Sequence, residues 1–190
     1  IKAAVPHEKK PDYLILNGIE CEPFLTADDR LMIERAEQII VGAKIINKVL
    51  GIQNAIIAVD ENKPEAIEIL TNISRRYVGV NVQVCATKYP QGGEKQLIQA
   101  ITGREVPPGK LPIDIGCIVQ NVGTVYAIYE AVMKHKPLFE RIVTVSGDAC
   151  ARPGNYLVRV GTPASFLIEQ CGGVSEDVDQ VIFGGPMMGT

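Results

Sequence analysis

Four carboxylates crowd into a short segment that directly follows an apolar run. The segment NGIECEPFLTADDR comes after YLIL and contains Glu20, Glu22, Asp28 and Asp29. A carboxylate at such a place can accept hydrogen bonds from a ribose diol or a similar polyol chain. It could also act as a base or a metal ligand, but no histidine and no second acidic cluster supports either role. Hydroxyl recognition is therefore the chemistry that this segment favours.

The same segment has a purely structural interpretation. Asp28 or Asp29 would cap the helix that follows, while Glu20 and Glu22 would be solvated. This interpretation accounts for the aspartates better than for the glutamates, because an E-x-E pair immediately after a buried strand lies where a pocket would open.

Two further turns carry residues suited to an anion. Gly92 and Gly93 precede a predicted helix whose first turn contains Glu94, and Asn121 precedes a helix that begins near Val122. Helix N-termini beside glycine offer free N–H groups and a positive dipole end to a phosphate. Glu94 and Asn121 are equally suited to stabilising their own helices, and spacing alone favours that role. The sequence contains neither a G-x-G-x-x-G nor a Walker A motif at these loops, so it does not predict a conventional dinucleotide or triphosphate site.

The elements that would position these loops follow a βαβ pattern. Strands are predicted over 13–16, 55–59, 80–86 and 116–120, and helices over about 29–50, 64–75, 94–102 and 122–134. This alternation predicts an α/β fold with a Rossmann-like, mainly parallel sheet and right-handed crossovers. Ligands of such sheets bind beyond the carboxyl ends of the strands, which is where all three loops lie.

The pattern changes after residues 135–141. Residues 104–114 are too rich in Pro and Gly for regular structure, and the C-terminal part reads as strand, turn at Pro153-Gly154, strand, helix over 163–170 and a third strand over QVIFGG. We expect a small β-grasp-like domain there, which gives domains at 1–137 and 138–190. GGPMMG at 184–189 is more simply a tight turn followed by apolar packing than a nucleotide loop.

Composition excludes several classes of function. Nineteen basic and 22 acidic residues give a net charge of −3 without charge blocks, so no nucleic-acid partner is expected. Apolar runs fall short of the roughly 20 residues that cross a bilayer, so no direct membrane insertion is expected. The opening IKAAVPHEKK has neither an initiator Met nor a signal-peptide layout, and we expect a piece of a longer protein.

The cysteines and histidines indicate neither a metal nor a nucleophile. The five cysteines are widely spaced without CxxC and are predicted to be mostly small buried residues, with Cys21 the exception to watch. His7 and His135 lie near predicted segment ends and are predicted to be on the surface. No motif supplies a catalytic residue.

Several long motifs in order carry a resemblance to a known family. They are LNGIECEPFLTADDRLM, YPQGGEKQLIQAITGREVPPG, LPIDIGCIVQNVGTVYAIYEAV and VIFGGPMMG. Through them the chain resembles RnfC, the C subunit of the Rnf electron-transport complex, and, more distantly, the NADH-binding flavoprotein subunit of respiratory complex I. The resemblance implies a domain that holds FMN and receives hydride from NADH, followed by a soluble-ligand-binding β-grasp (SLBB) domain.

The resemblance also assigns roles in the first loop. Asn17 and Glu20 would face the flavin, and Glu22 would lie toward the nicotinamide nucleotide. Ile19 stands where the complex I relatives have Asp, and Cys21 where they have Gly.

Further roles fall on the other loops and on the N-terminus. Gly92 and Glu94 match the second loop of the relatives, while Gly93 departs from it; Glu94 would contact the nucleotide, and Gly92 and Gly93 would be cofactor-binding residues of the same turn. Asn121 and Thr124 resemble contacts to the FMN phosphate. Lys2 corresponds to the lysine that ends the family's glycine-rich flavin loop.

That glycine-rich loop would lie upstream of residue 1, and the cysteine runs for iron–sulfur clusters would lie downstream. We therefore expect this chain alone to bind FMN weakly or not at all and to be inactive by itself, whereas the parent protein would be an oxidoreductase subunit. Its implied partners are NADH, other Rnf proteins of the complex and, indirectly, ferredoxin, at the inner face of the cell membrane on the cytoplasmic side.

Two alternatives remain open from the sequence. The chain could belong to an RnfC-like paralogue, such as a cobalamin reductase or an electron-transfer protein of an amino-acid reductase. It could instead be a docking module whose flavin site has degenerated, as the departures at Ile19 and Gly93 would suggest.

Overall fold

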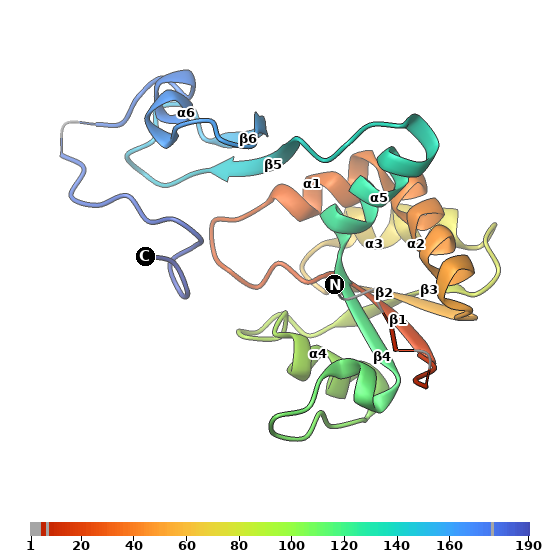
Figure 1. The fold of residues 1–190 in the computed structure, drawn as a ribbon. Coiled ribbons are helices and arrows are strands. Elements are labelled where there is room, and N and C mark those ends of the chain that lie inside the picture. The colour runs from red at the N-terminus through yellow and green to blue at the C-terminus, as the bar shows by residue number, and fades with distance from the viewer. Residues whose placement is uncertain (1–4, 7, 176) are drawn as a thin grey trace.

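The computed structural model describes residues 5, 6, 8–175 and 177–190, so Lys2 and His7 lie outside it. Its centre is a four-stranded, fully parallel sheet with the order β3-β2-β1-β4 (Figure 1). The strands are β1 (Tyr13–Gly18), β2 (Asn54–Asp60), β3 (Val80–Cys85) and β4 (Cys117–Asn121). The predicted parallel α/β sheet is confirmed.

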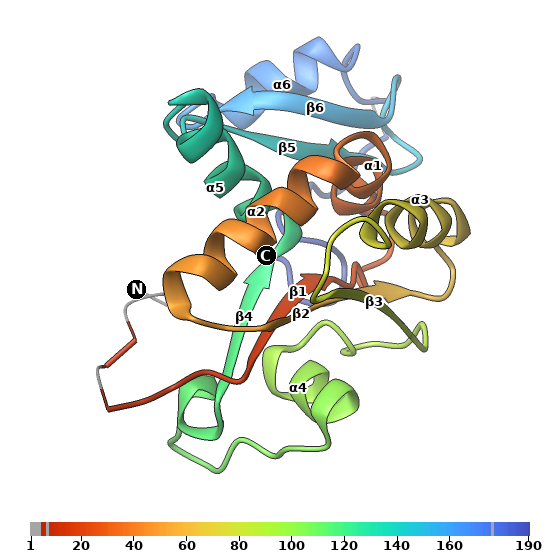
Figure 2. The same cartoon turned by 90° about the vertical axis from the view of Figure 1, so that its right-hand side faces the viewer.

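Helices cover both faces of the sheet. On one face lie α1 (Ala27–Glu34), α2 (Ala36–Leu50), α3 (Pro64–Ser74) and α5 (Val122–Lys134), and on the other lies α4 (Glu94–Thr102) (Figure 2). A 3-10 turn, η1 (Pro112–Ile115), ends the loop predicted at 104–114. Along the chain, β1, β2 and β3 are added one after another in one direction across the sheet, and the chain then returns past β1 to form β4 on its other side. Because this last crossover runs in the opposite direction and is also right-handed, its helix α4 lies on the opposite face of the sheet.

The single helix predicted over 29–50 is two helices. Arg35 leaves the helical region, with φ −131° and ψ 26°, and separates α1 from α2. Leu31 and Met32 of α1 are buried, as are Ile39 and Ile40 of α2. Both pieces have apolar residues at helical spacing, so the sequence pattern does not reveal the break between them.

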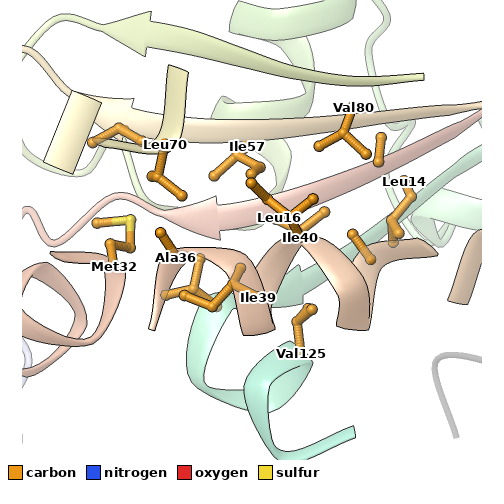
Figure 3. Packing of buried hydrophobic residues seen from close by; sticks show 14 of the residues in the cluster. Leu14, Leu16, Met32, Ala36, Ile39, Ile40, Ile57, Leu70, Val80 and Val125 are labelled. Carbon is orange, nitrogen blue, oxygen red and sulfur yellow. The ribbon is translucent and has the colours of Figure 1, made fainter. Parts of the chain in front are cut away.

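The strands bury side chains on both faces. Leu14 and Leu16 of β1 point into a core shared with Ile39, Ile40 and Ile57, while Ile15 points the other way, into a smaller core beneath α4 (Figure 3). Alternate strand residues face opposite sides, and a parallel sheet covered by helices has no solvent face. This accounts for the continuous apolar run YLIL.

The C-terminal part is a small antiparallel unit. It contains β5 (Glu140–Val145) paired with β6 (Gly154–Arg159), followed by α6 (Ala164–Gln170). The third strand predicted over QVIFGG is not present. Gly184 and Gly185 have positive φ angles, which turn the chain back so that Phe183 and Thr190 exchange two backbone hydrogen bonds.

GGPMMG is confirmed as a tight turn, but the predicted apolar packing after it is wrong. Met187 and Met188 are 54% and 75% exposed, so both side chains remain largely accessible to solvent.

The cysteines and His135 lie largely as predicted. Cys85, Cys117 and Cys171 are buried, Cys21 and Cys150 are half-buried, and all five are free thiols, although Cys150 Sγ lies 3.4 Å from Cys171 Sγ. His135 is exposed. Over the described part of the chain, no metal-binding group of three or more His, Cys, Asp or Glu residues is found, and no helix has both the length and the apolar character to span a bilayer.

Close packing of α2 on α5 requires a glycine. A Cβ added at Gly42 would lie 2.5 Å from the carbonyl oxygen of Val125, so we expect Gly42→Ala to force the helices apart and to lower the free energy of unfolding by about 1–3 kcal/mol. Gly154→Ala is the matched control, since the nearest heavy atom to its Cβ would be 3.8 Å away. Urea unfolding measures both; equal effects would contradict the close contact.

Candidate functional site

The candidate site lies at the carboxyl ends of β1 and β4. These strands are neighbours in the order β3-β2-β1-β4 although they are first and fourth along the chain, so the strand order reverses between them, and open α/β sheets bind ligands at such a reversal. Asn17 and Asn121 are register partners at these two ends, and Asn121 Nδ2 lies 3.5 Å from the carbonyl oxygen of Asn17. The first and third predicted loops therefore meet.

Asn17 also joins the first loop to the second. Its Nδ2 donates to the carbonyl of Gly92 at 2.9 Å, and its Oδ1 accepts from the Ile19 amide at 3.1 Å. A Cβ at Gly92 would lie 3.1 Å from Ile19 O and 3.3 Å from Cys21 Sγ, so glycine allows the two loops to pack. Gly93 is the N-cap of α4, and Glu94 is the first residue of that helix.

Ile19 is a core residue. It is 7% exposed and packs with Ile15, Leu97 and Ile98 in the core beneath α4. An unpaired carboxylate would be costly at this place, whereas an aliphatic side chain anchors the loop by burying its surface.

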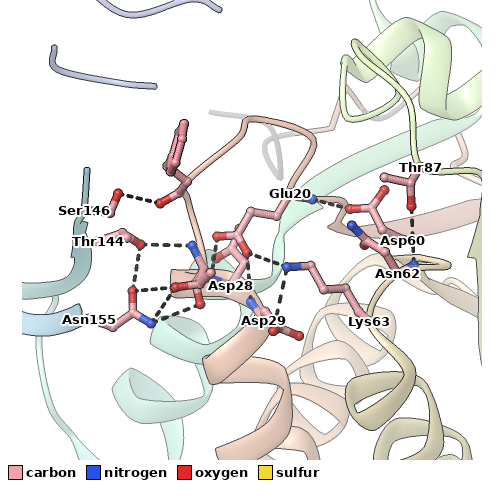
Figure 4. Close-up of polar contacts among 12 residues, drawn as sticks. Glu20, Asp28, Asp29, Asp60, Asn62, Lys63, Thr87, Thr144, Ser146 and Asn155 are labelled. Carbon is pink, nitrogen blue, oxygen red and sulfur yellow. Dashed lines mark hydrogen bonds and ion pairs between the residues drawn. The ribbon is translucent and has the colours of Figure 1, made fainter. Parts of the chain in front are cut away.

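Glu20 supplies the N-terminal cap of α1. Its Oε1 accepts from the Asp28 amide at 3.0 Å and its Oε2 from the Asp29 amide at 3.3 Å, while Lys63 Nζ lies 3.7 Å from Oε2 (Figure 4). The Glu20 side chain is 7% exposed, and this burial raises the pKa of its carboxyl group above the ordinary value.

The structural interpretation of the acidic segment was therefore wrong in its detail. The two aspartates do begin a helix, but the residue that satisfies its free N–H groups is Glu20, and Glu20 is not solvated. Thr26, at the N-cap position, makes no side-chain cap bond.

The beginning of α5 combines an amide, a carboxylate and a guanidinium. Asn121 caps this helix, accepting from the Gly123 amide at 2.9 Å, and donates to Asp28 Oδ2 at 2.7 Å. Arg141 Nη2 donates to Thr124 Oγ1 at 3.3 Å. Burial raises the pKa of Asp28, against the opposing influence of Asn121 and Arg141. Arg141 lies on β5 and was missed, because no local pattern relates it to residues 17 positions earlier.

Glu22 stands apart from these clusters. Its Oε2 accepts a hydrogen bond from the Met187 amide at 3.0 Å, and its Oε1 is buried without a hydrogen-bond partner among the described residues. The turn at 184–189 therefore reaches a predicted site residue, a contact that the sequence does not indicate.

Asp60, at the end of β2, was also missed. It is fully buried, and its Oδ2 accepts from the Glu20 amide at 2.8 Å. Burial raises the pKa of Asp60, while the Glu20 amide and the Lys63 ammonium act in the opposite direction. The sequence feature that could have identified Asp60 is its position as a carboxylate directly after the apolar run AIIAV.

The raised pKa of Asp60 gives a pH dependence of known sign. Because the pKa of Asp60 is higher in the folded than in the unfolded protein, its protonation stabilises the fold at a pH below the ordinary aspartate pKa of about 4. This stabilisation is lost as the pH rises through the pKa that Asp60 has in the folded protein. Asn at this position cannot ionise, so Asp60→Asn should gain stability relative to wild type between about pH 4 and pH 8. Urea unfolding of the variant and of wild type at about pH 4 and about pH 8 tests this, with Asp148→Asn, a change at an exposed residue, as the control. A difference in unfolding free energy between Asp60→Asn and wild type that does not change with pH would contradict the prediction.

A cavity of about 590 Å³ lies beside this end of the sheet, between α1, α5 and the β5–β6 pair. Its lining includes Asp28, Asn121 and Arg141, together with Tyr126 and Leu157. Residues at the start of α5 and residues of the C-terminal unit therefore line the same cavity.

The family of the chain follows from comparison with known proteins. A model of the Nuo51 FMN-binding domain matches residues 1–130, and a model of the SLBB domain matches residues 142–190. The chain therefore belongs to the Nuo51 FMN-binding domain family, with an SLBB domain after it. The predicted RnfC resemblance is confirmed as well.

The curated relatives are the C subunits of ion-translocating complexes. Over its whole length the chain is 49% identical to the C subunit of the proton-translocating ferredoxin:NAD(+) oxidoreductase complex of Clostridium ljungdahlii, and 48% identical to that of the Na(+)-translocating complex of Acetobacterium woodii. It spans 41% and 43% of these two proteins. The fold also matches a crystal structure of an NAD+-reducing NiFe-hydrogenase, with a TM-score of 0.72, 23% identity and coverage of 86% of this chain and 33% of that one.

Proposed function

We propose that this chain is the FMN- and NADH-binding part of an RnfC-type protein, which accepts hydride from NADH and passes electrons toward ferredoxin. The observation that carries the proposal is the cluster of Asn17, Gly92 and Asn121 at the strand crossover, within a domain that matches the Nuo51 FMN-binding family. The names of the relatives, which describe ferredoxin:NAD(+) oxidoreductase complexes, support electron exchange between a nicotinamide nucleotide and ferredoxin.

The residues present fit a flavin nucleotide. Gly92 lets the first and second loops pack closely beside the site, and Asn121, Thr124 and Arg141 gather polar groups at the start of α5 where a phosphate would bind. In this proposal Asn17 and Glu20 lie on the flavin side, with Glu20 acting by fixing the loop onto α1. Lys2 would reach the same cofactor.

The nicotinamide nucleotide would use a second set of residues. Glu22 Oε1 is a buried carboxylate oxygen without a hydrogen-bond partner in the part of the chain that the structure describes, and a ribose hydroxyl is a group that would satisfy it. Gly93 and Glu94 would contribute at the start of α4. Because Ile19 is a core residue, its departure from the relatives' Asp leaves these side chains in place, which argues against a degenerate site.

The chemistry belongs to the cofactor. Bound FMN supplies the hydride acceptor, and the protein's task is to hold the two rings in contact and to exclude water. This agrees with a site built from amides, glycines and capped helix ends.

We propose that the division between the two domains lies at 137–138, which falls between the two family matches. We also propose that the parent protein holds iron–sulfur clusters downstream, binds the other Rnf proteins of its complex and sits peripherally on the cytoplasmic face of the membrane. The membership of the relatives in ion-translocating complexes supports this location.

The deciding experiment uses the full-length protein. Reconstituted with FMN and titrated anaerobically with NADH, its flavin absorbance should bleach, whereas residues 1–190 alone should take up little FMN. Failure of the full-length protein to bind FMN would exclude the proposal. Oxidation of the reduced flavin by ferredoxin, and not by a cobalamin, would separate it from the paralogue alternative.

A further inference from the structure

We propose that the SLBB region, residues 142–190, positions the acidic loop, residues 19–26, for nucleotide binding. The SLBB region would thus be part of the nucleotide site's framework and not only a docking module. This inference rests on the function proposed above, and it is carried by three separate contacts between the SLBB region and the acidic loop.

The first contact fixes the end of the acidic loop. The Thr26 amide donates to Thr144 Oγ1 at 3.2 Å, and Asn155 Nδ2 donates to the carbonyl and the hydroxyl of Thr26 at 3.2 and 3.0 Å (Figure 4). Thr144 and Asn155 are themselves joined across β5 and β6 by a 2.7 Å hydrogen bond. The antiparallel pair therefore presents a preformed polar site to the backbone that leads into α1.

The second contact holds a strained residue. Ser146 Oγ donates to the carbonyl of Phe24 at 2.7 Å, and Phe24 has a φ of +66°. A non-glycine residue in the left-handed region persists only where its surroundings fix it. Ser146 supplies that fixing contact from the SLBB region.

The third contact orients Glu22. The Met187 amide donates to Glu22 Oε2, and a Cβ at Gly185 would lie 2.7 Å from the same oxygen. Since Gly185 also has a φ of +96°, only glycine allows this approach. The turn at 184–189, which the proposed function leaves without a role, thereby holds one carboxylate oxygen, while the other has no partner among residues 5, 6, 8–175 and 177–190.

The two ends of the acidic loop are held differently. The α/β domain holds Glu20, through Asp60 and the start of α1. The stretch from Glu22 to Thr26 forms several hydrogen bonds in which at least one partner is a side-chain atom. Among the described residues, all of these bonds lead to the SLBB region. Loss of these contacts should free Glu22 while leaving Asn17 and the flavin side in place.

The test compares Asn155→Ala and Ser146→Ala with Glu169→Ala, an exposed change on α6, in the full-length protein loaded with FMN. Amide hydrogen exchange over residues 19–30 and steady-state NADH oxidation are measured on each. In the first two variants we expect faster exchange in that stretch and a KM for NADH raised about 5- to 30-fold, with unchanged FMN content and a nearly unchanged kcat.

The outcomes separate this inference from the proposed function. If wild type oxidises NADH but both variants behave like Glu169→Ala in exchange and KM, the positioning role is overturned and the proposed function stands. If KM and kcat change together with FMN loss, the contacts are merely structural, and the inference fails. If wild type takes up no FMN, the proposed function fails, and with it the nucleotide role assigned to these contacts.

Discussion

Replacing Glu22 with glutamine in the full-length protein should raise the KM for NADH roughly 10- to 100-fold with little change in FMN content. Glutamine has the same shape and can still accept the Met187 amide hydrogen bond, so the turn at 184–189 should stay in place. What is lost is the negative charge on the oxygen that lacks a partner, and hydrogen bonds to a charged acceptor contribute about 1.5–3 kcal/mol.

Anaerobic steady-state kinetics and flavin quantification measure the two effects separately. Glu68→Gln, an exposed change on α3, is the matched control and should behave as wild type. Equal loss of FMN and of NADH use in Glu22→Gln would show that Glu22 serves the fold or the flavin, against the role assigned to it.

The second large effect is expected at Asn17. Asn17→Ala should lower the affinity for FMN by roughly 10-fold or more and cost about 1–3 kcal/mol of stability, because it leaves the Gly92 carbonyl and the Ile19 amide without their partner. These two groups belong to the first and second loops, so their separation should open the site at its centre. Equilibrium dialysis of FMN and urea unfolding measure the two quantities.

Two comparison variants sharpen the result. Asn17→Asp keeps the acceptor for the Ile19 amide but loses the donor to Gly92, so it should resemble Asn17→Ala if the link between loops matters most. Asn72→Ala, exposed on α3, should leave both quantities unchanged. Normal FMN binding by Asn17→Asp would show that the link to Gly92 is dispensable.

Short-range patterns were sufficient for the parallel sheet and for part of the site. The continuous run YLIL predicts a strand buried on both faces, and Asn121 before an apolar helix predicts a cap that accepts from Gly123. Both depend on neighbours within a few residues, which a sequence displays directly.

Contacts that depend on tertiary packing were not predictable in this way. Glu20 caps α1 because the loop folds back eight residues, and Glu22 meets Met187 across 165 residues. The break at Arg35 leaves the helical pattern unchanged, and the missing third strand depends on a turn at Gly184 and Gly185. In each case the residue types fit two local structures, and distant partners determine which one forms.

The hydrogen bonds between Thr26 and Asn155 join residues 129 positions apart, which bears on the order of folding. Contacts of such long sequence separation carry a large loop-closure cost and form after local structure. The acidic loop should therefore acquire its final shape late, once both the parallel sheet and the β5–β6 pair exist. Partial unfolding confined to the C-terminal unit would then disorder the part of the acidic loop from Glu22 to Thr26 and leave the parallel sheet intact.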